Sequence, residues 1–180
     1  MSDMLATLER IDRRLQRWSS STASSAPTKT PKLQLSPLLA WQQQVVAEAR
    51  RFNVVCVGRR AGKTALGVHL CAAHDVLAYP VGWFSPSYKL MLEVWREVVR
   101  VFAPIIARQN ATERRLEFAT GGVLEFWSLD NPQAGRGRKY RRVIIDEAAF
   151  VPDLMDVWNY AIRPTLAAMR GDAWVKSTPK

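Results

Sequence analysis

One short segment limits the folds open to this chain more than any other. The run Asn-Val-Val-Cys-Val at 53–57 is apolar enough to be a strand buried on both faces. It leads into Gly-Arg-Arg-Ala-Gly-Lys-Thr at 58–64 and then into a helical pattern from Lys63 to about Leu77. A strand, a glycine-containing loop and a helix in this order predict a phosphate-binding loop.

The residue types of the loop suit a bound phosphate. Glycine lets backbone N–H groups close around phosphate oxygens, and the following helix points its positive end at the anion. Lys63 is expected to reach the β- and γ-phosphates of a nucleotide, and Thr64 to bind Mg²⁺. The spacing departs from the usual motif, because Val57 stands where the first glycine is normally found. A strand–helix turn that binds nothing is the alternative.

A second apolar strand, at 142–145, ends in the two acids Asp146 and Glu147. In enzymes with a phosphate-binding loop, the first acid holds Mg²⁺ and the next activates the attacking water. Two acids after a strand can also cap a helix. Because this pair follows a Gly-Lys-Thr loop, the catalytic interpretation is favoured.

Helical and strand patterns alternate over the rest of the chain, which predicts an α/β fold with a mostly parallel sheet flanked by helices. Helices are expected at 38–51, 63–77, 88–102 and 154–169, the last with a break before Pro164. Strands are expected at 53–57, 81–85, 142–145 and 174–177. A hairpin is expected from 115–118 and 123–128, around Gly121 and Gly122.

The region before the predicted domain divides into two parts. Residues 1–18 predict an amphipathic helix with a short heptad-like apolar stripe, expected to dock on a partner or on its own domain. Residues 19–37 are rich in Ser, Thr and Pro and predict a flexible linker. The folded domain is therefore expected at 38–180, and its C-terminal part is expected to be incomplete.

Composition indicates which kind of partner the chain binds and in which compartment it is expected. The chain has 26 Lys and Arg against 16 Asp and Glu, a net charge of +10, which favours a polyanionic partner, usually nucleic acid. A basic surface kept for solubility is the alternative that charge alone leaves open. Cys56 and Cys71 lack zinc-site spacing and are expected to be small core residues, and His69 and His74 do not make a metal site the better interpretation. No apolar run is long enough to span a bilayer, so a cytoplasmic protein without a membrane partner is expected.

Several motifs together resemble the large subunit of phage terminases, the motors that package DNA into tailed-phage capsids. They are the loop at 58–64, the run Ile-Ile-Asp-Glu-Ala-Ala-Phe at 144–150 and Ser-Thr-Pro at 177–179. Trp41-Gln42, Arg136-Gly137 and Ile-Arg-Pro-Thr-Leu at 162–166 also match. A shortened, arginine-rich phosphate loop is typical of that family. The resemblance runs from Leu38 to the end and implies a P-loop NTPase fold of the RecA-like, ASCE type.

The resemblance also implies cofactors and residue roles. ATP and Mg²⁺ are the expected cofactors, with Thr64 and Asp146 as metal ligands. Glu147, Lys63 and Arg136 are expected to be catalytic, Arg136 as an arginine finger acting on the ATP of a neighbouring subunit. Nucleotide binding is expected at eight positions: Gln42, Gly58, Arg59, Arg60, Ala61, Gly62, Lys63 and Thr64.

Within this set, Gln42 would read adenine beside Trp41, and Arg59 would sense the phosphates of its own subunit's nucleotide. Coupling of hydrolysis to movement is expected at Ser177, Thr178 and Pro179.

Some of these assignments have alternatives within the chain. Gln43 or Gln44 could read adenine in place of Gln42. The finger could instead be another cation of the same segment: Arg138, Lys139, Arg141 or Arg142. Thr178-Pro179 could be an ordinary turn after a strand.

The resemblance implies a motor domain that hydrolyses ATP and drives viral double-stranded DNA into the procapsid. A homo-oligomeric ring, a portal and a small terminase subunit are the implied protein partners, in the host cytoplasm if a phage encodes the chain. Full-length members of the family carry a second, nuclease domain, so endonuclease activity is expected only in a full-length protein.

Two other functions compete with the motor. A fragment of a superfamily 2-like helicase or translocase core would share the Gln, loop and acid motifs. However, Ala148-Ala149 follow the acids here, where many helicases have Ala-Asp or Ala-His. The other candidate is a non-catalytic module that binds nucleotide and DNA during assembly, against which the complete set Lys63, Asp146 and Glu147 argues.

Overall fold

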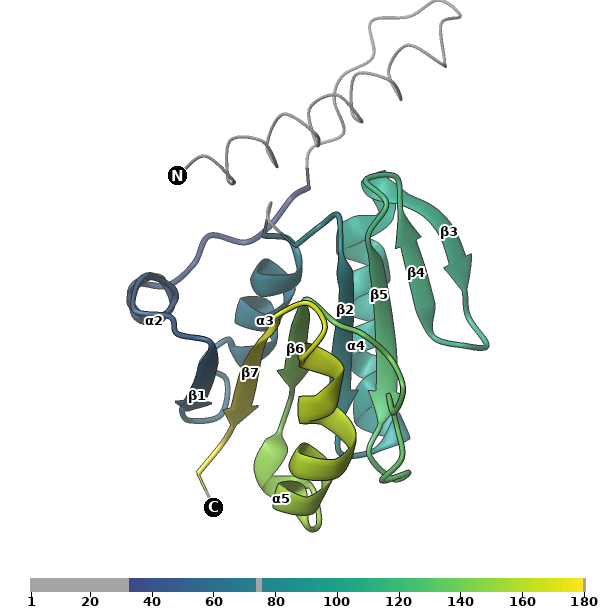
Figure 1. Ribbon diagram of the computed structural model, residues 1–180. Helices are drawn as coiled ribbons and strands as arrows, with labels where there is room; N and C mark the ends of the chain where they lie inside the picture. Colours follow the sequence, from purple (N-terminus) through teal and green to yellow (C-terminus); the bar gives the residue numbers. More distant parts are fainter. Residues whose placement is uncertain (1–32, 74–75, 180) are drawn as a thin grey trace, which may run out of the picture.

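A seven-stranded sheet forms the centre of the computed structural model, which describes residues 33–73 and 76–179 (Figure 1). The strand order is β1-β7-β6-β2-β5-β4-β3, and the first five strands are parallel. These five are β1 (Phe52–Cys56), β7 (Asp172–Ser177), β6 (Arg142–Ile145), β2 (Pro80–Ser85) and β5 (Val123–Ser128). Antiparallel β4 (Arg115–Phe118) and β3 (Ile106–Asn110) extend the sheet beyond β5. The predicted mostly parallel α/β sheet is confirmed.

Helices cover both faces of this sheet. In Figure 1, α3 (Lys63–Cys71) and α4 (Tyr88–Phe102) lie behind it and α5 (Leu154–Val157) lies in front. The winding of α5 continues through a π-helical turn, η3 (Trp158–Ile162), and a 3-10 turn, η4 (Arg163–Leu166). The remaining helical segments are α2 (Ala40–Ala47), η1 (Ala103–Ile105) and η2 (Ala148–Phe150).

Successive side chains of the central strands enter two different cores. Trp83 and Ile144 pack into the core beneath α3 and α4. Their neighbours Phe84 and Ile145 pack into the core beneath α5. Side chains alternate between the faces of a strand, so a strand covered on both faces is apolar throughout. This explains why the sequence at 142–145 reads as one apolar run.

The helix predicted at 88–102 is α4, with the same bounds. Ser87 caps its N-terminus, where its hydroxyl accepts a hydrogen bond from the backbone N–H of Leu90 at 3.5 Å. The buried side chains of α4 recur every three or four residues: Met91, Val94, Trp95, Val98 and Phe102. A cap followed by a regular apolar stripe is the strongest helix signal that a sequence carries.

Other predicted boundaries differ from the structure. The helices predicted at 38–51 and 63–77 are the shorter α2 and α3. The expected break before Pro164 is a change of helical pitch, because the proline stands in the first turn of η4, where its missing N–H is not needed. Strand β3 was not predicted, since Ala107, Arg108 and Gln109 are exposed and show no apolar alternation.

The prediction that the strand at 53–57 is buried on both faces is wrong. Among the described strands, β1 pairs only with β7 and therefore forms an edge of the sheet. Val54 is 80% exposed and Cys56 is also exposed, so Cys56 is not the core residue that was expected. Cys71 is buried as expected, and burial raises the pKa of its thiol to about 12.

The amphipathic helix predicted at 1–18 and most of the predicted linker lie outside the described residues. Leu33 and Leu35, at the end of that linker, are packed against the core beneath α3 and α4. Over the described parts of the chain, no helix has the length and apolar character needed to cross a membrane.

Candidate active site

The predicted phosphate loop and acidic pair meet at the carboxyl ends of the parallel strands. Lys63 follows β1, Glu147 follows β6 and Thr178 follows β7, and these three strands are neighbours in the order β1-β7-β6. Parallel strands bring their carboxyl ends to the same edge, where α/β proteins place their ligands. Segments more than 80 residues apart in sequence are thereby brought into contact.

The loop has the backbone shape that an anion site requires. Arg60 and Gly62 adopt left-handed conformations, with φ of 59° and 85°. At Gly62 a Cβ atom would lie 2.9 Å from Nε2 of Gln42, so a larger residue would be both strained and crowded. The space around Gly58 is open. Helix α3 begins at Lys63, so its first N–H groups belong to the loop.

Lys63 is the centre of the polar contacts at this edge. Its side chain is 6% exposed. Its ammonium donates to the hydroxyl of Thr178 at 2.7 Å and to the carbonyl of Gly58 at 3.1 Å, and it lies 3.6 Å from Oε1 of Glu147. The cation of the loop, the second acid of the pair and the Ser-Thr-Pro segment therefore form one cluster.

Asp146 and Glu147 have different partners although they are adjacent. Glu147 is in a left-handed conformation with φ of 46°, directly after the end of β6. The carboxylate of Asp146 is buried, accepts a hydrogen bond from the backbone N–H of Glu147 at 3.1 Å and lies 3.4 Å from Nζ of Lys176. The carboxylate of Glu147 is instead 3.2 Å from the hydroxyl of Thr178.

The end of β7 contacts both motifs. The hydroxyl of Thr178 lies between Lys63 and Glu147. The hydroxyl of Ser177 accepts a hydrogen bond from the backbone N–H of Ala149, just after the acidic pair, at 3.0 Å. Pro179 is exposed.

A cavity of about 350 Å³ opens beside this cluster. Its walls are formed by Arg59, Arg60, Lys63, Leu90, Glu147, Phe150 and Thr178. Three cations and one carboxylate surround it, an arrangement that suits a phosphate chain with a water at its end. Leu90 and Phe150 add apolar surface.

The residues proposed as metal ligands fit Mg²⁺ in chemical type. Thr64 and Asp146 offer oxygen atoms, which this hard cation prefers. Over residues 33–73 and 76–179, no group of three His, Cys, Asp or Glu side chains is placed to hold a metal ion. Mg²⁺ at a nucleotide site typically takes one or two carboxylates and completes its shell with phosphates and water.

Gln42 touches the phosphate loop directly. It is 2% exposed, its Oε1 accepts from the backbone N–H of Leu39 at 2.8 Å, and its Nε2 donates to the carbonyl of Gly62 at 3.0 Å. Gln43 and Gln44 are exposed. Of the three glutamines, Gln42 is thus the one at the site, and both ends of its amide are bonded to backbone groups.

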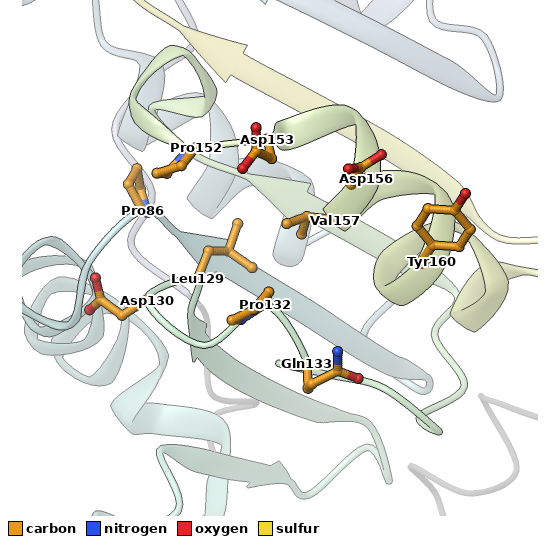
Figure 2. A pocket seen from close by; sticks show the side chains of 10 residues that line it. All are labelled: Pro86, Leu129, Asp130, Pro132, Gln133, Pro152, Asp153, Asp156, Val157 and Tyr160. Carbon is orange, nitrogen blue, oxygen red and sulfur yellow. The ribbon is translucent and has the colours of Figure 1, made fainter.

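A larger cavity of about 510 Å³ lies at the same edge of the sheet, between the residues that follow β2 and β5 and the start of α5 (Figure 2). Asp130, Asp153 and Asp156 line it, and its lining includes no Lys or Arg. Hydrogen bonds from Ser128 and from the backbone of Tyr88 lower the pKa of Asp130. An acidic lining does not suit phosphate groups, so this cavity is not the nucleotide site.

The predicted finger Arg136 lies in the connection from β5 to β6, at 129–141. Gly135 and Gly137 on either side have φ of 73° and 80°. Arg136 is exposed and bonds to the side-chain oxygen of Gln133. It does not line the 350 Å³ cavity, so a role at its own subunit's site has no support.

Two of the other candidate cations are held elsewhere. Arg138 lies with its Nε 3.5 Å from the buried carboxylate of Glu125 and its guanidinium over the ring of Trp127. Arg142 is buried and makes two bonds of 2.7 Å to the carboxylate of Asp172. Arg136 is therefore freer to reach outward than either of them.

Glu125 also anchors the connection at 129–141 through Tyr140, whose hydroxyl donates to the Glu125 carboxylate at 2.6 Å. Burial, followed by the Glu125 carboxylate, raises the pKa of Tyr140.

Sequence comparison relates the chain to phage terminases. No model of a known protein family matches the chain. The large terminase subunit of Escherichia phage T5 is 28% identical over 177 residues, which are 94% of this chain and 39% of that protein. The large terminase subunit of Thermus virus P23-45 is 33% identical over 152 residues, 71% of this chain and 31% of that protein. The chain is a homologue of phage large terminase subunits.

Solved terminase structures share the fold. The ATPase domain of the Thermus phage P74-26 large terminase aligns with a TM-score of 0.69 and 23% identity, over 85% of this chain and 71% of that one. The HK97 bacteriophage large terminase gives 0.66 and 14%, over 83% and 36%. The large terminase of a thermophilic bacteriophage, in complex with ADP, gives 0.58 and 16%, over 78% and 39%. The chain thus has the P-loop fold of a terminase ATPase domain and spans less than two-fifths of the T5 and P23-45 relatives.

Sequence reasoning missed Lys176. It directly precedes the Ser-Thr-Pro segment and follows the apolar run Ala-Trp-Val at 173–175, which was the available signal. In the structure it is fully buried. Burial lowers the pKa of its ammonium, and the Asp146 carboxylate opposes that shift.

Proposed function

We propose that this chain is the ATP-hydrolysing motor domain of a phage large terminase subunit, which drives viral DNA into the procapsid. The observation that carries the proposal is the meeting of Lys63, Glu147 and Thr178 at one cavity. A phosphate-loop cation, a candidate general base and a strand-end hydroxyl are the parts that hydrolysis and its coupling to movement require.

The residues divide the chemistry among themselves. Lys63 binds the β- and γ-phosphates, and Arg59 and Arg60 add positive charge at the mouth of the cavity. Glu147 accepts the proton of the attacking water. Thr64 and Asp146 would hold Mg²⁺, which neutralises phosphate charge when bound.

Thr178 couples nucleotide binding at Lys63 to the position of strand β7. Phosphates that draw Lys63 toward themselves compete with its 2.7 Å bond to Thr178. Loss of that bond changes the contacts at the end of β7, next to Ser177, whose hydroxyl holds the segment after the acids. Nucleotide state and strand position are coupled in this way.

Larger parts of the proposal concern the assembly. Arg136 completes the site of a neighbouring subunit in a homo-oligomeric ring, and double-stranded DNA passes through that ring. A portal and a small terminase subunit are the further partners, in the host cytoplasm. These points rest on homology, on the exposure of Arg136 and on the net charge of +10.

The deciding experiment is a steady-state ATPase assay of the chain with and without double-stranded DNA. We expect Mg²⁺-dependent hydrolysis that DNA stimulates, lost in Lys63→Ala and kept in Lys89→Ala, which removes an exposed cation of α4. DNA affinity should fall steeply with salt and tolerate any sequence. Unchanged nucleotide affinity in Lys63→Ala would contradict the loop assignment.

The same preparations test the two competing functions. Separation of DNA strands without translocation of duplex DNA would indicate a helicase core. Binding of nucleotide and DNA without turnover would indicate an assembly module.

A further inference from the structure

The ammonium of Lys176 lies buried beneath the proposed active site. Nζ donates to the backbone carbonyl of Lys63 at 2.9 Å and lies 3.4 Å from Oδ1 of Asp146. It also lies 4.4 Å from the centre of the Trp83 ring, within the range of a cation–π contact. One fully buried cation thus touches the first residue of α3, the first acid of the pair and the core of the sheet.

The fold leaves room for this ammonium at Gly67. A Cβ atom there would lie 2.5 Å from Nζ of Lys176 and 2.3 Å from the Trp83 ring. Because Trp83 is fully buried in the core, neither neighbour can move aside freely. The compartment is therefore shaped around the lysine, and an alanine at Gly67 would displace it.

A buried ammonium is costly and is not needed to fill space. An unbranched apolar side chain such as methionine has similar length and avoids the desolvation of a charge. Lysine differs from methionine here by the cation–π contact with Trp83 and by two polar contacts. One polar contact is with the carbonyl of Lys63, the residue before Thr64, and the other is with the carboxylate of Asp146. Thr64 and Asp146 are the two proposed Mg²⁺ ligands.

We propose that Lys176 is a positioning residue that sets both ligands for the Mg²⁺–nucleotide complex. Both described contacts of the Asp146 carboxylate involve Oδ1, which leaves Oδ2 for a ligand bond. The bond to the Lys63 carbonyl fixes the start of α3 and with it Thr64. This inference rests on the proposed function.

The test is a titration of Mg²⁺ against a fluorescent ADP analogue, compared with binding of the analogue in EDTA. Loss of a residue that orients metal ligands without touching the metal typically weakens metal affinity about 10–100-fold. We expect Lys176→Met to raise the half-saturating Mg²⁺ by that amount and to change affinity in EDTA by less than about threefold. Lys176→Gln keeps one donor and should fall between. Lys89→Met, at an exposed lysine, should match the wild type.

A double variant separates positioning from a general loss of structure. If Lys176 acts through Asp146, Lys176→Met added to Asp146→Asn should raise the half-saturating Mg²⁺ little beyond Asp146→Asn alone. Unchanged half-saturation in Lys176→Met, or losses that add in the double variant, would overturn the inference. If Lys176→Met does not fold by circular dichroism, Lys176→Gln decides by the same measure. Failure of the wild type to bind the analogue would instead sink the proposed function.

Discussion

The hydroxyl of Thr178 lies 2.7 Å from the ammonium of Lys63, so the end of β7 and the phosphate loop hold each other directly. The same hydroxyl is within 3.2 Å of the Glu147 carboxylate. Through one side chain, the strand that carries the Ser-Thr-Pro segment touches both the proposed phosphate-binding group, Lys63, and the candidate general base, Glu147.

Replacing Thr178 by valine removes this hydroxyl and preserves the shape of the side chain. We expect hydrolysis to fall by about tenfold or more, because the Glu147 carboxylate loses the hydroxyl that orients it, and a hydrogen bond to a charged group is worth about 1.5–3 kcal/mol. Nucleotide affinity should change by less than about threefold, since the phosphate-binding groups remain. Thr178→Ser keeps the hydroxyl and should retain most of the activity. Steady-state rates and nucleotide titrations on the three proteins check this.

The acidic pair should divide into a base and a metal ligand. Glu147→Gln should keep ATP bound and slow hydrolysis by about 10²–10⁴-fold, because the amide preserves shape and removes the base. Asp146→Asn should chiefly weaken Mg²⁺-dependent binding. Single-turnover rates and nucleotide titrations distinguish the two. Equal loss of binding in both variants would show that the roles are not separate.

Gln42 offers a test of how the nucleotide base is recognised. Its amide is bonded to Leu39 and Gly62, so reading adenine would require Nε2 to leave the loop. We expect Gln42→Ala to weaken ATP and GTP alike, through loss of support for the loop. The ratio of their dissociation constants should equal that of the wild type. A selective loss of ATP affinity would instead support the prediction that Gln42 reads adenine.

The finger is tested by mixing inactive variants. Arg136→Ala and Glu147→Gln should each be inactive, and their mixture should regain part of the activity if Arg136 acts on a neighbour. An arginine in this role is worth about 10³–10⁵ in rate. Lys139→Ala, at an exposed cation of the same segment, is the matched control and should stay active.

The same experiment can also reassign the finger. Arg163, at the start of η4, is exposed and lies in another matched segment. Recovery with Arg163→Ala, but not with Arg136→Ala, in rings shown to contain both variants would move the finger to Arg163.

How far the sequence predicts this protein depends on whether the signal is local. Helix α4 carried its own cap and apolar stripe, and β6 its own apolar run, so both were predicted with the observed bounds. The meeting of Lys63 and Glu147 could also be predicted, because carboxyl ends of parallel strands share an edge. These features are fixed by nearby residues or by a general rule of topology.

The features that were missed depend on distant neighbours. The apolar run of β1 does not reveal that this strand lies at an edge, because burial is decided by the strand order. Lys176 gave no local sign of its partners, since Lys63, Asp146 and Trp83 come from three other segments. Composition reports how apolar a segment is and not what lies beside it.

The left-handed backbone of Glu147 sets function against stability. A non-glycine residue in such a conformation costs about 1–3 kcal/mol, and the surrounding fold must supply it. Glycine relieves that strain and asparagine tolerates it better than glutamate. A search for heat-resistant variants of this chain would therefore favour Glu147→Gly or Glu147→Asn, and would discard the candidate general base to gain that resistance.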